Sequence, residues 1–87
     1  MVPIEFDMIV FKEGKTFVAY SHELDISSCG KTVEQAKKNI KTAVKLFLEE
    51  AEKMGTVEDI LKESGYEKVG NRWIAPKMIA TELVGVH

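Results

Sequence analysis

The sequence has few of the residues that fix a chain covalently or locally, with one cysteine and two prolines in 87 residues. Because Cys29 has no second cysteine to pair with, an intramolecular disulfide framework is excluded, as is usual in a reducing compartment. The N-terminus lacks the basic start and apolar run of a signal peptide, and no apolar run approaches the ~20 residues of a membrane span. We therefore expect a cytoplasmic protein with no membrane partner.

An excess of basic residues is also missing. The formal net charge is −2, and lysine and glutamate alternate along the chain rather than cluster. A surface that binds nucleic acid normally carries a basic stripe that neutralises phosphates, so we expect no direct DNA binding. A slightly acidic domain is compatible instead with docking on a basic protein.

No catalytic or metal-binding pattern stands out, so we expect no catalytic residue, no metal and no cofactor. A nuclease of the RNase H type would need several carboxylates that converge on a divalent metal. The acidic candidates have ordinary interpretations instead. Asp7 is expected on an exposed strand face, Glu23 and Asp25 in a solvated turn, and Glu34 in a first helical turn, where it complements the helix dipole.

The histidines and the cysteine carry no pattern of their own. His22 has no cysteine or carboxylate partner at ligand spacing along the sequence, so it is expected to be exposed, and His87 is the terminal residue. Cys29 would need a neighbouring base to act as a nucleophile, and the sequence places none. We expect Cys29 to be a small, half-buried residue.

Alternating polarity predicts three strands in the first third of the chain. Residues 4–11 alternate with period two and become apolar on both faces toward the end, which is typical of a strand in the interior of a sheet. Glu13-Gly14-Lys15 then predicts a turn, and residues 16–21 a hairpin partner. Residues 25–29 predict a shorter third strand that ends at Gly30.

A long amphipathic helix follows. Thr32 and Gln35 have the spacing of a capping box, in which each side chain bonds to the backbone near the other. Gly55 follows the last apolar position, as expected for the glycine after a helix. The apolar residues recur every three or four positions and predict one buried stripe, formed by Ala36, Ile40, Ala43, Val44, Phe47, Leu48, Ala51 and Met54.

The last third predicts smaller elements. A short helix begins near Thr56 and ends at Gly65, residues 66–69 and 72–74 flank a Gly70-Asn71 turn, and residues 78–86 read as a final strand. Together the pattern predicts a single α+β domain over residues 1–87. Its three-stranded antiparallel sheet and a later strand pack on one long helix, with a short second helix and a small hairpin.

The stretch YSHELDISSCGKTVEQAKKNIKTAVKLFLEEA, residues 20–51, resembles the HicB-like antitoxins. The resemblance covers residues 4–54 and leaves a C-terminal extension, residues 56–87. A Leu-Pro-Gly-Cys corner found in many members is absent here, and Cys29 stands where a polar residue is common. The matching positions are Tyr20, Glu23, Leu24, Asp25, Ser28, Gly30, Thr32, Ala36 and Asn39.

This resemblance implies a partial RNase H-like fold, βββαβ, that has lost the catalytic set, and a non-catalytic antitoxin that binds and masks a small basic RNA-cleaving toxin (HicA-like). Glu23 and Asp25 are candidates for charge complementarity with the partner, and Trp73 for an aromatic contact, although packing is favoured for Trp73. Gly30, Thr32 and Gln35 would be structural. The alternative is an orphan protein-binding or structural module without a toxin.

The chain is also expected to form a homodimer or a larger oligomer. A domain of 87 residues has a thin core, and association is one way to supplement it. The predicted final strand, residues 78–86, is apolar on both faces toward its end, and an edge of this kind invites pairing with a second copy. Whether it pairs within or between chains is left open by the sequence.

Overall fold

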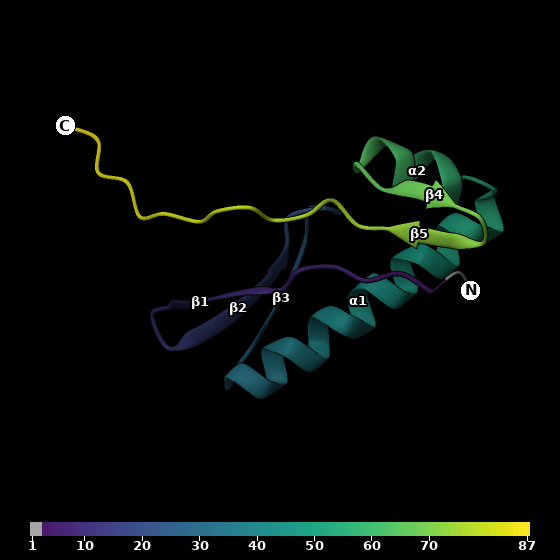
Figure 1. Cartoon of the computed structure of the whole chain (residues 1–87). Helices are drawn as coiled ribbons and strands as arrows, with labels where there is room; N and C mark the ends of the chain where they lie inside the picture. Colours follow the sequence, from purple (N-terminus) through teal and green to yellow (C-terminus); the bar gives the residue numbers. More distant parts are fainter. Residues whose placement is uncertain (1–2) are drawn as a thin grey trace.

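The computed structural model describes residues 3–87 as an α+β domain (Figure 1). Its sheet lies on one side of a long helix, and a short helix with a small hairpin lies beside the C-terminal end of that helix. No helix in the described range is at once long and apolar enough to cross a bilayer. The elements are β1 (Ile9–Glu13), β2 (Thr16–Ser21), β3 (Ile26–Gly30), α1 (Val33–Met54), α2 (Val57–Glu63), β4 (Glu67–Val69) and β5 (Arg72–Ile74).

The three-stranded sheet is antiparallel in the order β1-β2-β3. The hairpin between β1 and β2 closes at Glu13 and Thr16 around Gly14, whose φ of 61° lies in the left-handed region that glycine adopts without strain. Two expectations for the first strand are wrong. The strand begins at Ile9 rather than at Ile4, and it is an edge strand rather than an interior one.

The capping box predicted for α1 is present. The Thr32 side chain accepts a hydrogen bond from the Gln35 amide at 3.0 Å, and the Gln35 side chain accepts from the Lys31 amide at 3.1 Å. Gly55 closes the helix with a φ of 72°. These caps satisfy backbone groups that a helix end leaves without an intrahelical partner, which explains why the helix starts and stops where the sequence predicts.

The apolar stripe of α1 is narrower than predicted. Ala36, Ile40, Val44, Leu48 and Ala51 are buried. Phe47 and Met54 are correspondingly misassigned, because their side chains are 38% and 68% exposed. Buried positions four residues apart follow one line along the helix, and Phe47 lies just beside that line rather than on it.

Glycine at position 30 allows the sheet and the helix to approach closely. A Cβ atom built there would lie 2.7 Å from the Ala36 amide nitrogen and 2.9 Å from the Gln35 carbonyl carbon. Both neighbours are backbone atoms and cannot rotate away. The junction between β3 and α1 is also held by the Asn39 side chain, which donates to the Cys29 carbonyl oxygen at 2.8 Å. Residues of the motif around Gly30 thus fix how α1 leaves β3.

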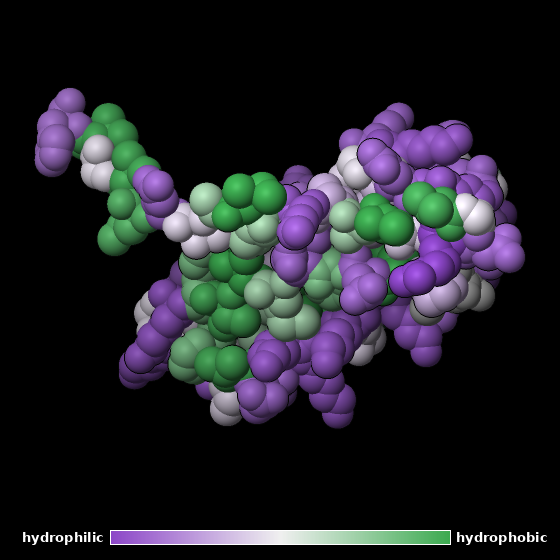
Figure 2. Space-filling view, in the orientation of Figure 1, coloured by the Kyte–Doolittle hydropathy of each residue, from purple (hydrophilic) through white to green (hydrophobic). Residues whose placement is uncertain are grey.

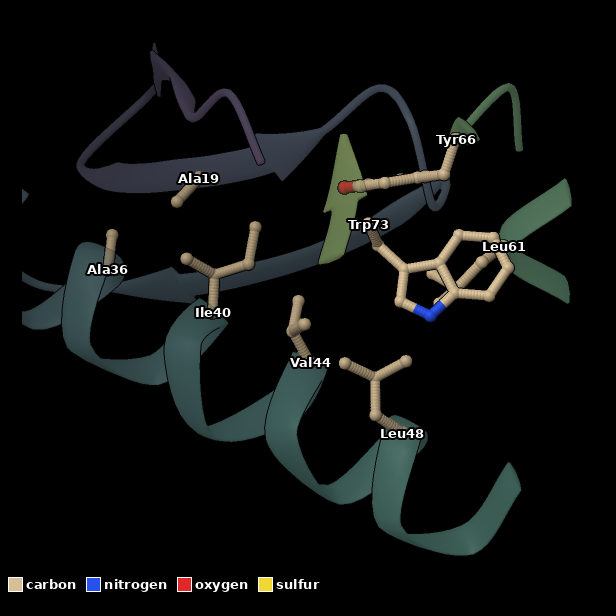
Figure 3. Close-up of a cluster of buried hydrophobic side chains, with 8 residues drawn as sticks. All are labelled: Ala19, Ala36, Ile40, Val44, Leu48, Leu61, Tyr66 and Trp73. Carbon is tan, nitrogen blue, oxygen red and sulfur yellow. The ribbon is translucent and has the colours of Figure 1, made fainter. Parts of the chain in front are cut away.

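One hydrophobic core joins the sheet, α1 and the C-terminal hairpin. Figure 3 shows Ala19 of the sheet facing Ala36, with Ile40 next to them along the helix. Farther along, Leu61 of α2 and Trp73 of β5 close the core beside Leu48. The predicted hairpin is confirmed, with Lys68 opposite Trp73, and so is the packing role favoured for Trp73, which is 8% exposed.

The predicted final strand is wrong. Residues 75–87 carry no regular secondary structure and run away from the body of the domain as an extended segment (Figure 1). With this projection the radius of gyration is 14.5 Å, whereas a compact domain of this length has a radius of about 12 Å. No strand of the described chain pairs with the segment, so the later strand expected to complete the sheet is missing from it.

Candidate functional site

The corner that follows β2 brings together several residues of the matched motif. Asp25 has a φ of 54°, a left-handed conformation that aspartate and asparagine tolerate better than most residues. Its carboxylate accepts a hydrogen bond from the Tyr20 hydroxyl at 3.0 Å, and this bond raises the pKa of Tyr20. Asp25 is exposed, as expected for a solvated turn, and its charge is available to a partner.

Glu23 differs from the expectation for the same turn. Its side chain is fully buried, so the assignment to a solvated turn is wrong. One carboxylate oxygen accepts from the Asp7 amide at 2.6 Å, and the other accepts from the Ser21 hydroxyl at 3.2 Å. These hydrogen bonds satisfy a buried charge, which would otherwise be costly, and they tie the corner to the N-terminal segment.

His22 lies between two carboxylates that the sequence separates. Its Nε2 is 3.5 Å from Asp7 Oδ2 and 3.6 Å from Glu23 Oε1. These separations are long for hydrogen bonds. Atoms that coordinate one tetrahedral zinc ion at about 2.0–2.1 Å lie roughly 3.3–3.4 Å apart, so the two separations at His22 are close to those between metal donors. The three donor atoms all lie within 4.8 Å of one another.

The sequence predicts no ligand partner for His22 and therefore does not predict the Asp7–His22–Glu23 cluster. The register of the hairpin could have predicted part of it. Strand β1 pairs with β2 so that Ile9 faces Tyr20, and continuing this pairing by two residues puts Asp7 opposite His22. The burial of Glu23 carries no such signal, since it depends on the path of residues 3–8 across the corner.

Tyr66 lies in the same negative environment. Its hydroxyl donates to the Glu5 carbonyl oxygen at 2.6 Å, which anchors the N-terminal segment a second time. Burial, together with the negative charges of Glu23, Asp7 and Glu5, raises the pKa of Tyr66 well above its usual range. The ring therefore stays neutral, and its hydroxyl keeps its role as a donor.

Trp73 contributes little accessible area for a partner. Its ring lies against Lys68, whose Nζ is 5.7 Å from the ring centroid and 2.8 Å from Glu58 Oε1. The hydrogen bond to Lys68 lowers the pKa of the Glu58 carboxyl. A shallow pocket of about 190 Å³ lies beside the ring and the N-terminal segment, lined by Pro3, Ile4, Glu5, Asn71, Arg72 and Trp73.

The C-terminal segment exposes several large apolar side chains. Ile79 is 85% exposed, and Leu83 is fully exposed. Hydrophobic side chains also gather over the sheet below the base of this segment (Figure 2). Phe11, at 49% exposure, and the exposed Cys29 lie on the sheet face opposite α1, so the half-buried position expected for Cys29 is wrong. Protein partners typically cover apolar surfaces of this kind.

Taken together, these features describe a small α+β protein with an acidic corner and a projecting apolar segment. No family model matches the chain, and neither the curated proteins nor the solved structures contain a detectable match.

Proposed function

We propose that this domain is a non-catalytic, antitoxin-like protein that binds a small basic RNA-cleaving toxin and masks its RNA-binding surface. The proposal extends the resemblance to the HicB-like antitoxins. The observation that carries it is that the matched residues fix both ends of β3. In the corner between β2 and β3, Glu23 holds the N-terminal segment; at the far end of β3, Gly30 allows α1 to approach closely and Asn39 ties α1 to the strand.

The corner between β2 and β3 offers a physical basis for choosing a basic partner. Asp7 and Asp25 are exposed on it, and the whole chain carries a net charge of −2. Opposite charge steers two proteins toward each other and raises the association rate more than it raises affinity. Glu23 acts indirectly in this proposal, because its buried carboxylate fixes the corner and cannot reach a partner.

Inhibition of the toxin is the direct test. A ribonuclease encoded beside this chain is expected to lose RNA cleavage when one equivalent of the protein is added. Asp25→Asn removes the exposed charge and leaves a residue that tolerates the left-handed backbone at this position. This variant is expected to bind the toxin more slowly at low salt, with a smaller difference at high salt because exposed charges are then screened. Undiminished RNA cleavage with the intact protein would contradict the proposal.

The alternative within the same class is an orphan module that binds another protein or has a structural role. A neighbouring reading frame for a small basic polypeptide favours the antitoxin, and its absence favours the orphan module. Either form is expected to lack direct DNA binding. The only helix after Met54 in the described range is α2, which has seven residues, and a helix-turn-helix needs a further recognition helix for the major groove.

The Asp7–His22–Glu23 cluster favours a second candidate, a metal-dependent enzyme. Imidazole and carboxylate donors suit zinc or manganese, and a metal there could activate water. Against it, both oxygens of Glu23 already accept hydrogen bonds from within the protein.

We expect calorimetric titration with Mn²⁺ or Zn²⁺ to show no tight binding at this cluster. A metal bound by the Glu23 carboxylate would compete with the hydrogen bond that the Asp7 amide donates to it, and this bond holds the N-terminal segment to the corner. His22→Ala is the informative variant, and His87→Ala is a matched control because it removes the other histidine of the chain. Tight binding that is lost in His22→Ala and kept in His87→Ala would overturn the non-catalytic assignment.

A further inference from the structure

Two segments have the sequence polarity of strands but no strand partner within residues 3–87, the part of the chain that the structure describes. Residues 3–8 are extended ahead of β1, and their side chains alternate between exposed and half-buried. The described chain gives this segment no backbone ladder. Its anchors are side chains instead, with Glu23 bound to the Asp7 amide and Tyr66 bound to the Glu5 carbonyl.

The anchored backbone groups leave a free edge on the other side. In an extended chain, successive residues direct their backbone groups to opposite sides. The Glu5 carbonyl oxygen bonds to the Tyr66 side chain, and the Asp7 amide bonds to the Glu23 side chain. Farther along on the same side, Glu13 pairs with Thr16 at the closed end of the hairpin. The backbone groups of the intervening even-numbered residues, 4 to 12, therefore point outward. This edge belongs to a segment whose sequence is that of an interior strand.

The second strand-like segment without a strand partner is at the C-terminal end of the described chain. Residues 78–86 are apolar on both faces toward their end, and Leu83 and Val86 are more than nine-tenths exposed. A strand of this composition is stable when both of its faces are covered, and an uncovered one invites pairing with another chain. In the described chain it projects into solvent (Figure 1).

We propose that residues 78–86 of one copy add as a strand to the free edge, residues 4–13, of a second copy, and that the exchange is reciprocal. The lengths match: nine residues meet ten, and each spans about 30 Å as a strand. A reciprocal exchange uses the same pair of surfaces twice, so it closes as a two-fold dimer. Both strand-like segments then have a partner, and the first strand becomes interior.

The surface beside the free edge fits this occupant. A groove of about 180 Å³ lies between the N-terminal segment and α1, lined by Pro3, Ile4, Phe6, Lys41, Val44, Lys45 and Leu48. Its walls are mostly apolar and would receive the side chains on one face of the added strand. Lys41 and Lys45 at its rim carry charge opposite to that of Glu82, the acidic residue of the added strand. Charge and hydrophobicity therefore both favour a second copy of this chain.

Light scattering tests the proposal on the full chain. At micromolar concentration the mass is expected to be twice the chain mass of 9.8 kDa. Removing residues 77–87, or introducing Leu83→Asp, is expected to return the mass to that of one chain. Val69→Asp is the matched control, since Val69 is also an exposed apolar residue but lies on β4. A monomeric full chain, or a dimer that survives removal of the segment, would overturn the proposal.

A second pair of variants tests the free edge, residues 4–13. Lys12 lies on β1 with its amide directed outward, so Lys12→Pro removes a donor of the free edge without breaking the hairpin ladder. Lys12→Ala removes the charge and keeps the amide. Lys12→Pro is expected to weaken the dimer at least tenfold, and Lys12→Ala to leave it unchanged, with circular dichroism confirming that both are folded. Equal dimerisation of the two variants would rule out this edge as the place where residues 78–86 of the second copy pair.

Discussion

Ile40→Ala is expected to lower the free energy of unfolding by about 2–5 kcal/mol. Ile40 is fully buried in the N-terminal half of α1, where it belongs to the core that joins the helix to the sheet. Truncation removes buried methyl and methylene groups and leaves a cavity that the helix backbone cannot collapse to fill. A domain of 87 residues has about 4–13 kcal/mol of total stability, so this loss is a large share of it.

Urea denaturation at equal chain concentration measures the effect, because association would make stability depend on concentration. Lys38→Ala, at an exposed position of α1 outside the proposed dimer groove, is the matched control and is expected to cost less than about 0.5 kcal/mol. Phe47→Ala is expected to cost less than Ile40→Ala despite the larger side chain, because Phe47 is 38% exposed. A larger cost for Phe47→Ala would show that α1 is rotated relative to the sheet.

Trp73→Ala is expected to lower the free energy of unfolding by about 3–5 kcal/mol. The indole closes the far end of the core beside Leu48 and Leu61, and it is the large side chain that the small hairpin contributes there (Figure 3). A two-stranded hairpin is marginal alone, so β4 and β5 depend on this anchor to stay docked.

Ile74→Ala provides the comparison for Trp73. Ile74 is the next residue on β5 and is 48% exposed, so its side chain points to the other face of the hairpin. Ile74→Ala is expected to lower the free energy of unfolding by less than a third as much as Trp73→Ala in the same denaturation experiment. Comparable losses from the two substitutions would mean that the hairpin is stabilised by strand pairing rather than by the buried indole.

Much of the fold follows from local chemistry and could be predicted. The capping box at Thr32 and the glycine after Met54 fix both ends of α1, since they satisfy backbone groups within a few residues. The turn at Gly14 and the small hairpin around Gly70 are equally local. These features need no knowledge of the rest of the chain.

The burial of individual residues was harder to predict. Phe47 and Ile40 share one apolar stripe in the sequence, and only the direction from which the sheet approaches distinguishes them. Glu23 reads as a solvated turn residue because nothing near it in sequence shows that the Asp7 amide will reach its carboxylate. The cluster around His22 likewise forms through contacts between residues fifteen or more positions apart along the chain.

The two strand predictions that differ from the structure share a physical cause. Both residues 4–8 and residues 78–86 have strand-like polarity, and neither finds a ladder within the described chain. Sequence pattern reports which faces of a segment are to be buried, but it does not report which chain buries them. The proposed pairing between two copies would account for both differences at once.

Amide hydrogen exchange on the intact protein at micromolar concentration tests this pairing most directly. The outward amides of Ile4, Phe6 and Met8 and those of residues 78–86 have no backbone partner within the described chain. They are expected to exchange slowly in the full chain, and those of the N-terminal segment to exchange fast once residues 77–87 are removed. Fast exchange of both segments in the full chain would contradict the exchange of strands between two copies.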